Sequence, residues 1–311
     1  MQNKIAAIKN NIEKVIVGKG DVVDIILTAI FSKGHVLIED VPGIGKTTLV
    51  RALAASIGCG FQRIQFTPDV MPSDVTGFSV FDMASGELKF RQGAIMQQII
   101  LADEINRTSP KTQSSLLEVM QERQVTVDGN TYVMPEPFIV LATQNPVEHI
   151  GTFPLPEAQL DRFFIKVFLG YPGVKEEIEI LDRHDHEDMQ AANLEAVVNA
   201  QDILQMQKAA EKVECSGSIK EYIALLIGQT RTSPDLTLGA SPRGGIALMK
   251  AAKAWAFINK RQFVIPDDVV HMAVPVLAHR LILKPEARIK DMTAERIIKS
   301  IIAATRIPDA V

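Results

Sequence analysis

The sequence predicts an α/β fold in which a parallel sheet with covering helices is followed by a second, all-helical domain. Up to residue 170, short apolar runs typical of buried strands alternate with segments of helical periodicity. Beyond residues 170–173 (GYPG), nearly every segment carries the helical repeat alone. The most polar stretch of the chain, 183–193, is the expected boundary between the two. We therefore expect domains at 1–190 and 191–311.

Composition limits the possible functions. A chain of 311 residues is long enough for two cores, and 47% hydrophobic with 23% charged residues is typical of a globular protein in water. The net charge of −4 argues against a broad nucleic-acid surface, and one Trp leaves few rings for stacking on single-stranded bases. No apolar run approaches the roughly 18 residues that span a bilayer, and no secretion signal opens the chain. We expect a cytoplasmic protein without a transmembrane segment.

Residues 35–48 (HVLIEDVPGIGKTT) predict a phosphate-binding loop. A short apolar run leads through a Pro/Gly turn into a helical pattern, and the exposed amides of such a helix start attract an anion. Gly43 and Gly45 allow the backbone to approach phosphate closely. Lys46 is placed to reach the β- and γ-phosphates of a nucleotide, and the Thr47 hydroxyl to hold Mg²⁺.

The match to G-x-x-x-x-G-K-[ST] is incomplete, because Asp40 stands where the motif has its first Gly. Asp40 lies at the strand exit, before the loop closes, so a phosphate loop remains possible. The alternative is an ordinary tight turn before a helix. The residues expected to bind the nucleotide are Pro42, Gly43, Ile44, Gly45, Lys46, Thr47 and Thr48.

A second apolar run, residues 99–104 (IILADE), ends in two adjacent acids. A buried parallel strand delivers such acids to the carboxyl edge of the sheet, where open α/β sheets bind ligands. Asp103 is expected to bind Mg²⁺ directly or through water, and Glu104 to orient or deprotonate an attacking water. The alternative, a strand that merely ends in solvent, is disfavoured by the phosphate loop upstream.

Three later polar residues complete the predicted site. Asn145 follows an apolar strand and would position the water if that strand neighbours the phosphate-loop strand. Arg162, in PEAQLDRFF, lies on the rim and is placed to serve a neighbouring subunit. Arg243, in SPRGG at a helix start, is expected to close over the phosphates of its own chain. For an isolated arginine, surface ion pairing is the commoner role.

Taken in order, GIGKTT, LADEINR, LATQNP, LPEAQLDRFF and SPRGG resemble the motifs of the MoxR family of AAA+ ATPases over nearly the whole chain. The resemblance implies a P-loop NTPase with a parallel five-stranded αβα core and a C-terminal all-α helical lid. It also implies roles for the predicted residues: Lys46 and Thr47 in Walker A, Asp103 and Glu104 in Walker B, Asn145 as sensor 1, Arg162 as arginine finger and Arg243 as sensor 2.

Further expectations follow from the resemblance. Val17 and Gly18 would lie near the adenine of ATP. The hairpins that alternating patterns predict at 77–91 and 125–134 would be a helix-2 insert and a pre-sensor-1 insert. The family forms a ring, usually hexameric, with ATP between subunits. Its members remodel client proteins in a chaperone-like manner, often beside proteins with a von Willebrand factor A domain.

The expected function is therefore Mg²⁺-dependent ATP hydrolysis that drives remodelling of a partner. A non-hydrolysing scaffold ordered by nucleotide is one alternative, although it has no need of the water-activating Glu104. A magnesium-chelatase-like motor subunit is another, because it shares both inserts. A nucleic-acid motor is disfavoured by the acidic charge.

Overall fold

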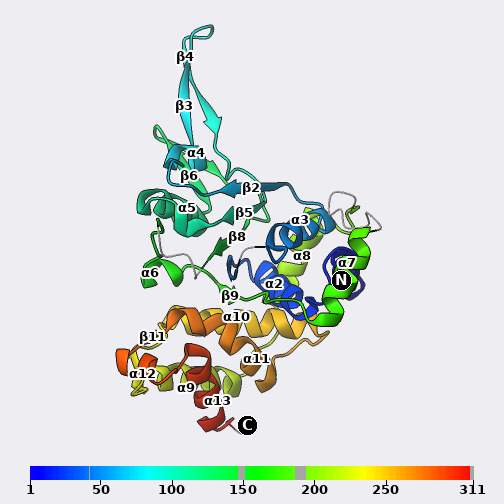
Figure 1. Cartoon of the computed structure of the whole chain (residues 1–311), viewed down its shortest axis with the longest axis vertical. Coiled ribbons are helices and arrows are strands. Elements are labelled where there is room, and N and C mark those ends of the chain that lie inside the picture. Colours follow the sequence, from blue (N-terminus) through cyan, green and yellow to red (C-terminus); the bar gives the residue numbers. More distant parts are fainter. Residues whose placement is uncertain (42, 146–150, 186–193, 309–311) are drawn as a thin grey trace.

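A five-stranded parallel sheet in the order β2-β5-β8-β1-β9 forms the centre of the fold. The structure is a computed structural model that describes residues 1–41, 43–145, 151–185 and 194–308. The strands, in chain order, are β1 (Val36–Glu39), β2 (Phe61–Gln65), β5 (Ile99–Asp103), β8 (Ile139–Gln144) and β9 (Ile165–Val167). This sheet, with the helical region that follows it, confirms the predicted α/β fold with a helical lid (Figure 1).

Parallel pairing brings the carboxyl ends of these strands to one edge. In β1, Val36 pairs with Leu141 of β8 on one side and with Ile165 of β9 on the other. On its other side, β8 pairs with β5. The strand that Asn145 follows, β8, therefore neighbours the phosphate-loop strand β1, which is the condition that the predicted role of Asn145 required.

Helices cover both faces of the sheet, on opposite sides in Figure 1. Val36 and Ile38 pack in one hydrophobic cluster with helix α3 (Lys46–Ser56). Residues of α1 (Gln2–Glu13) and α2 (Gly20–Phe31) belong to the same cluster. Leu37, which points the other way, packs in a second cluster with α5 (Pro110–Glu122). Burial on both faces explains why these strands are continuous apolar runs in the sequence.

Local sequence signals set where α5 begins. Ser109 is its N-cap and accepts a hydrogen bond from the Thr112 amide, and Pro110 occupies the first position. A short helix before the first hairpin, α4 (Pro72–Thr76), was not predicted, because its segment carries turn-forming residues.

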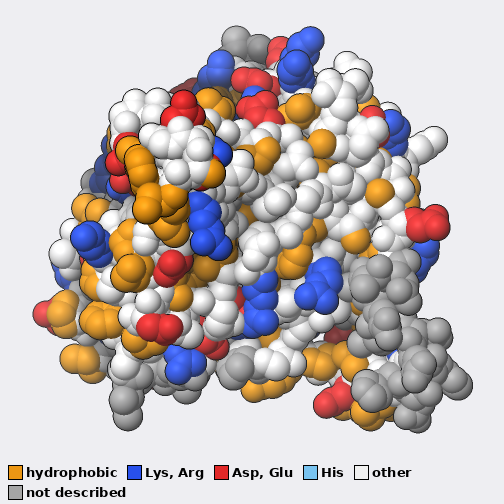
Figure 2. Space-filling view, turned by 90° about the horizontal axis from the view of Figure 1, so that it is seen from above, with side chains coloured by type: hydrophobic (Ala, Val, Ile, Leu, Met, Phe, Trp, Pro, Cys, Tyr) orange, Lys and Arg blue, Asp and Glu red, His pale blue; other side chains and the backbone are white. Residues whose placement is uncertain are grey.

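Both predicted hairpins are present. The first pairs β3 (Gly77–Asp82) with β4 (Glu87–Gln92) and rises away from the core in Figure 1. The second pairs β6 (Gln124–Val127) with β7 (Asn130–Val133). Phe90 of the first stacks on Tyr132 of the second with ring centroids 3.9 Å apart. Figure 2 shows apolar side chains among charged ones on the face that carries the first hairpin, where Met83 is exposed.

The rest of the described chain is mostly helical, as predicted. It comprises α6 (Glu157–Leu160), α7 (Val174–Asp185), α8 (Ala200–Glu211), α9 (Gly217–Thr232), α10 (Pro242–Ile258), α11 (Pro266–Leu277), α12 (Pro285–Ile289) and α13 (Ala294–Ala304). The antiparallel pair β10 (Leu236–Leu238) and β11 (Ile282–Leu283) was missed, since both strands are shorter than a detectable alternation. The boundary predicted at 190/191 lies outside the described residues. None of the helices in the described ranges has the length and apolar character to cross a bilayer.

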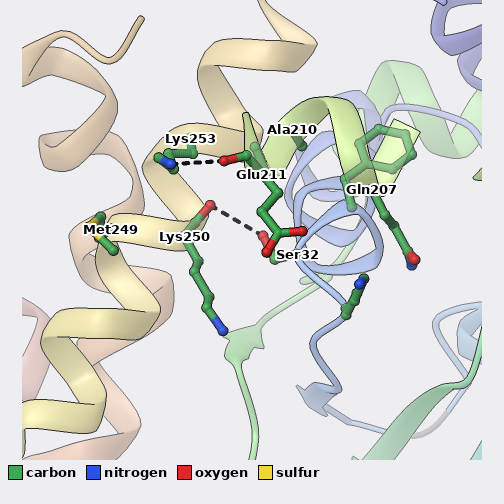
Figure 3. A pocket seen from close by; sticks show the side chains of 10 residues that line it. Ser32, Gln207, Ala210, Glu211, Met249, Lys250 and Lys253 are labelled. Atoms are coloured by element: carbon green, nitrogen blue, oxygen red, sulfur yellow. Dashed lines mark hydrogen bonds between the residues drawn. The ribbon is translucent and has the colours of Figure 1, made fainter. Parts of the chain in front are cut away.

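Helix α10 is anchored against α2 and α8. A cavity of about 230 Å³ lies between the three (Figure 3). At this cavity the Ser32 hydroxyl donates to the Lys250 carbonyl at 3.3 Å, and Lys253 Nζ donates to the Glu211 carbonyl at 2.9 Å. Buried Gln207 of α8 donates to the Ile30 carbonyl at 2.8 Å. These bonds fix α10 and α8 to the end of a helix that packs on the sheet.

His35, directly before β1, is hydrogen-bonded to strand β8 and helix α5. Its Nδ1 accepts a hydrogen bond from the Val140 amide at 3.0 Å, so its Nε2 carries the proton and donates to the Met120 carbonyl at 2.9 Å. Burial lowers the pKa of His35 from 6.5 to about 4, because charging the ring would cost its solvation. Protonation would also set a second N–H against the Val140 amide.

We predict that His35 makes the protein less stable in mild acid. The unfolded chain takes up a proton on this ring near pH 6.5, whereas the folded protein does so only near pH 4. The stabilisation is complete above pH 6.5 and is lost as the pH falls to about 4, by about 3 kcal/mol in total. Urea unfolding of the wild type and of His35→Gln, whose amide does not titrate, measures this. The stability gap between them should narrow with acid, and parallel pH curves would contradict the prediction.

Candidate nucleotide site

The loop after β1 has the geometry of a phosphate cradle. Gly43 and Gly45 have φ angles of +86° and +83°, a left-handed conformation that strains other residues, and open space lies where a Cβ would be. Helix α3 starts at Lys46 directly after Gly45, with no side-chain cap on its first amides. Amides at a helix start without a cap are donors for an anion, so the loop fits phosphate. Pro42 of the predicted set lies outside the described residues.

Lys46 lies within electrostatic reach of the acids on β5. Its Nζ donates to the Asp40 carbonyl at 2.8 Å. Half-burial lowers the pKa of Lys46, and the negative charges of Asp40, Asp103 and Glu104 oppose that shift. The structure therefore brings the predicted lysine and the predicted acid pair together at one edge of the sheet.

Asp103 is buried at the end of β5, and both of its oxygens have partners. Oδ1 accepts from the Thr143 hydroxyl at 2.6 Å, and that hydroxyl accepts from the Glu104 amide at 2.9 Å. Oδ2 accepts from Nε and Nη2 of Arg63 at 3.0 and 2.7 Å. The negative charge of the carboxylate is thus compensated by an arginine from the neighbouring strand β2.

Glu104 adopts an uncommon backbone conformation, with φ +56° and ψ +48°. Its Oε2 accepts hydrogen bonds from Gln65 Nε2 at 2.8 Å and from Arg107 Nη1 at 3.1 Å. A left-handed non-glycine residue beside a phosphate loop is typical of a functional site, where surrounding contacts hold a strained conformation.

The sequence pattern did not identify Arg63, Gln65 or Thr143 as part of this site. The signal was present in part, because the alternation of FQRIQF places residues 63 and 65 on one face of a strand. What the pattern lacks is the strand order, since only pairing of β2 with β5 brings that face to the acids.

Asn145 and Thr47 both lie at the carboxyl edge of the sheet. Asn145 is buried directly after β8, and its carbonyl accepts from Asn106 Nδ2 at 3.3 Å. Thr47 is half-buried in the first turn of α3. With Asp103, its hydroxyl supplies the hard oxygen ligands that Mg²⁺ prefers, so the residues present fit this ion.

A cavity of about 430 Å³ adjoins the phosphate loop. Its apolar and aromatic lining consists of Val15, Ile16, Val17, Ile44, Leu169, Tyr171, Pro172, Ile180 and Leu181. A flat, largely apolar ring such as adenine suits a pocket of this kind. Val17, which the family resemblance places near the adenine, thus lines the cavity beside the phosphate loop.

Gly18 packs tightly beside this cavity. Its φ is +69°, and a Cβ there would lie 1.9 Å from Glu176 Oε1. Glu176 in turn accepts a hydrogen bond from the Gly173 amide at 2.8 Å. A side chain at position 18 would therefore disturb the segment that leads into α7.

Arg162 lies at the opposite edge of the sheet from the phosphate loop. It comes just before β9, where the Phe164 amide donates to the His35 carbonyl. Arg280, in the turn η3 (Ala278–Arg280) of the lid, holds both sides of it: Nε donates to Asp161 Oδ1 at 2.9 Å, and Nη2 to the Phe163 carbonyl at 2.6 Å. Arg162 thus lies away from its own phosphate loop.

Arg243 is exposed in the first turn of α10. The adjacent Gly244, in the first turn of α10, packs so closely that a Cβ there would be 3.4 Å from Cδ of Arg280. Asp161 and Ser241 line one cavity of about 480 Å³ between α6 and this helix start. The start of α10 is therefore at the amino edge of the sheet. Whether Arg243 acts on the phosphates of its own chain or of a neighbour is therefore a question for experiment.

The fold and this site define a P-loop ATPase of the AAA+ class. Residues 35–165 match the ATPase family associated with various cellular activities (AAA), and residues 228–301 match the AAA lid domain. A solved structure from Cytophaga hutchinsonii ATCC 33406, of a protein provisionally designated an ATPase, superimposes with a TM-score of 0.93 at 39% identity. It covers 99% of this chain and 96% of that one.

Two similar proteins identify the family within the AAA+ class to which the chain belongs. Chaperone MoxR1 of Mycobacterium tuberculosis (strain ATCC 25618 / H37Rv) is 39% identical over 306 residues, covering 96% of this chain and 80% of the relative. The uncharacterized protein YeaC of Bacillus subtilis (strain 168) is 52% identical over 298 residues, covering 96% and 93%. The chain belongs to the MoxR family of AAA+ ATPases.

We predict that Gly18→Ala weakens nucleotide binding by about tenfold or more, because the methyl group displaces Glu176 and the backbone is strained. Titration with a fluorescent ATP analogue measures the loss. Gly217→Ala is the matched control, since Gly217 begins α9 with open space at its Cβ position. Equal affinities for the wild type and Gly18→Ala would contradict the prediction.

Proposed function

We propose that this protein hydrolyses ATP to ADP and phosphate and uses the cycle for chaperone-like remodelling or assembly of partner proteins. The observation that carries the proposal is the position of β8 between β1 and β5. It places the phosphate loop, Asn145 and the pair Asp103-Glu104 along one edge of the sheet. The Thr143 hydroxyl links that pair to β8.

Each residue of this edge has a role in the proposed reaction. Loop amides and Lys46 bind the phosphates of ATP and offset the charge that develops on the γ-phosphoryl group. Glu104 takes up a proton from the attacking water, which Asn145 orients. Thr47 and Asp103 would hold Mg²⁺, which supplies charge neutralisation between the β- and γ-phosphates when bound.

The site is proposed to be completed by a second copy of the chain. Arg162 and Arg243 both lie at the amino edge, and the phosphate loop lies at the carboxyl edge. In a head-to-tail assembly the amino edge of one subunit can face the carboxyl edge of the next, and repetition of that contact closes a ring. We propose a ring, a hexamer by family resemblance, in which both arginines act on the neighbour's ATP.

The partner is proposed from the family alone. A relative that shares 39% identity is named chaperone MoxR1, which supports a chaperone-like role for this chain. A client protein, or a companion protein with a von Willebrand factor A domain, is the expected partner. Nucleic acid is not, because the net charge of the chain is −4.

A non-hydrolysing, nucleotide-ordered scaffold is the second candidate. One observation favours it: the carboxylates of Asp103 and Glu104 are both engaged by Arg63, Gln65 and Arg107. If these contacts persisted with nucleotide bound, ATP would bind without being hydrolysed. Single-turnover hydrolysis distinguishes the two candidates.

We predict that Glu104→Gln lowers ATP turnover by 10²-fold or more, since the amide cannot accept the proton of water. Arg162→Ala should lower it by roughly 10³-fold, because the positive charge is lost from the transition state. Phosphate release measures both. Glu118→Gln and Arg288→Ala are the matched controls. Both change exposed residues and should keep wild-type turnover. Unchanged turnover in both test variants would refute hydrolysis at this site.

Mixed assemblies test whether Arg243 acts on a neighbour. Arg243→Ala retains its phosphate loop, and Lys46→Ala retains both arginines, so each alone should be nearly inactive. If Arg243 acts in trans, an equal mixture should recover activity at about a quarter of its interfaces, where an intact loop meets an intact arginine. The mixture of Arg162→Ala with Lys46→Ala is the parallel control. Recovery with Arg162→Ala but none with Arg243→Ala would show that Arg243 serves its own chain.

A further inference from the structure

Asp40, the residue that departs from the phosphate-loop motif, makes a contact far along the chain. Its Oδ2 accepts a hydrogen bond from the Gly170 amide at 2.6 Å, and its Oδ1 accepts from the Val41 amide at 2.9 Å. Its own carbonyl accepts from Lys46 Nζ at 2.8 Å. One residue therefore joins the start of the phosphate loop to a segment 130 positions later.

That segment is the wall of the cavity assigned to adenine. Leu169, Tyr171 and Pro172 line the cavity, and Gly170, with φ +64°, turns the chain between them. The wall is also held from its other side, because Lys19 Nζ donates to the carbonyls of Gly170 and Tyr171, each at 3.2 Å. Asp40 binds the amide of the segment and Lys19 binds its carbonyls.

The chemistry of these contacts explains how a carboxylate is compatible with a phosphate site. An acid near a triphosphate would repel it, and a glycine would not. Both oxygens of Asp40 accept from backbone amides, however, so its charge is partly compensated and directed at the wall. A glycine at position 40 could make neither bond, and the Gly170 amide would lose this partner.

We propose that Asp40 is a positioning residue that couples the phosphate loop to the adenine wall, so that the site recognises the base and the triphosphate as one unit. The proposal rests on the proposed nucleotide-binding function. It assigns to Asp40 no contact with the nucleotide. Its effect passes through residues 169–172, which Asp40 fixes at the distance from the loop that a whole nucleotide requires.

The first test examines the contact itself, without nucleotide. Hydrogen exchange of the Gly170 amide should accelerate by about tenfold or more in Asp40→Gly, which removes the acceptor, and by less in Asp40→Asn, which retains one carbonyl oxygen. Asp128→Asn, in the exposed turn of the second hairpin, is the control. Thermal unfolding verifies that each variant is folded. Unchanged exchange at Gly170 in Asp40→Gly would overturn the proposal.

The second test separates the base from the phosphates. Calorimetric titration should show ATP binding weakened by about tenfold in Asp40→Gly, with binding of inorganic triphosphate unchanged or slightly tighter. Lys19→Ala loosens the same wall from the other side and should weaken ATP but not triphosphate. Because the two contacts act on one segment, the double variant should lose less than the product of the single losses.

Two outcomes would overturn the coupling. Equal losses of ATP and triphosphate in Asp40→Gly would place the effect in the phosphate loop alone, and unchanged ATP binding would mean that the wall does not depend on Asp40. Failure of nucleotide binding, on which the proposal rests, is distinguishable from both. In that case the wild-type protein itself would bind no ATP, which would overturn the coupling as well, whatever the exchange at Gly170. Binding of ATP without hydrolysis would overturn the proposed hydrolysis and leave the coupling intact.

Discussion

The whole site depends on the insertion of one strand, β8, between the phosphate-loop strand and the strand that carries the acid pair. Parallel pairing leaves no freedom in where the ends of these strands lie, so the loop, Asn145 and Asp103 meet at one edge. The Thr143 hydroxyl makes this arrangement specific, because it donates to Asp103 and accepts from the Glu104 amide. A buried hydroxyl used in both directions fixes the orientation of two acids with a single side chain.

The site also requires that the negative charges of its two acids at the carboxyl edge of the sheet are compensated. Asp103 is buried and would be costly to keep ionised alone, and its pairing with Arg63 offsets that cost. Glu104 is held in a left-handed backbone conformation by contacts with Gln65 and Arg107. Compensation of this kind prepares the site for an anionic substrate, but it also means that a bound metal ion competes with Arg63 for the carboxylate of Asp103.

Local patterns predicted the parts of the fold that are specified locally. The phosphate loop, the buried strands and both hairpins follow from glycine spacing, apolar runs and turn residues within a few positions of each other. Arg63 was missed because its role depends on which strand β2 pairs with. The position of Arg243 could not be predicted, because no short pattern records that the start of α10 packs on Arg280. Nothing near Asp40 in the sequence shows why an acid stands in the phosphate loop, because its partner Gly170 is 130 positions away.

The structure divides its nucleotide chemistry between two edges, and each edge is tied to the helical region by a different contact. At the amino edge, Arg280 of the lid holds the residues on both sides of Arg162. At the carboxyl edge, Asp40 holds the segment that leads out of the core into α7. A shift of the helical region therefore reaches Arg162 and the adenine wall together. In the proposed ring, Arg162 would serve a neighbour while the wall serves its own chain, so nucleotide bound to one subunit would be coupled to the site of the next without any long-range path through the sheet.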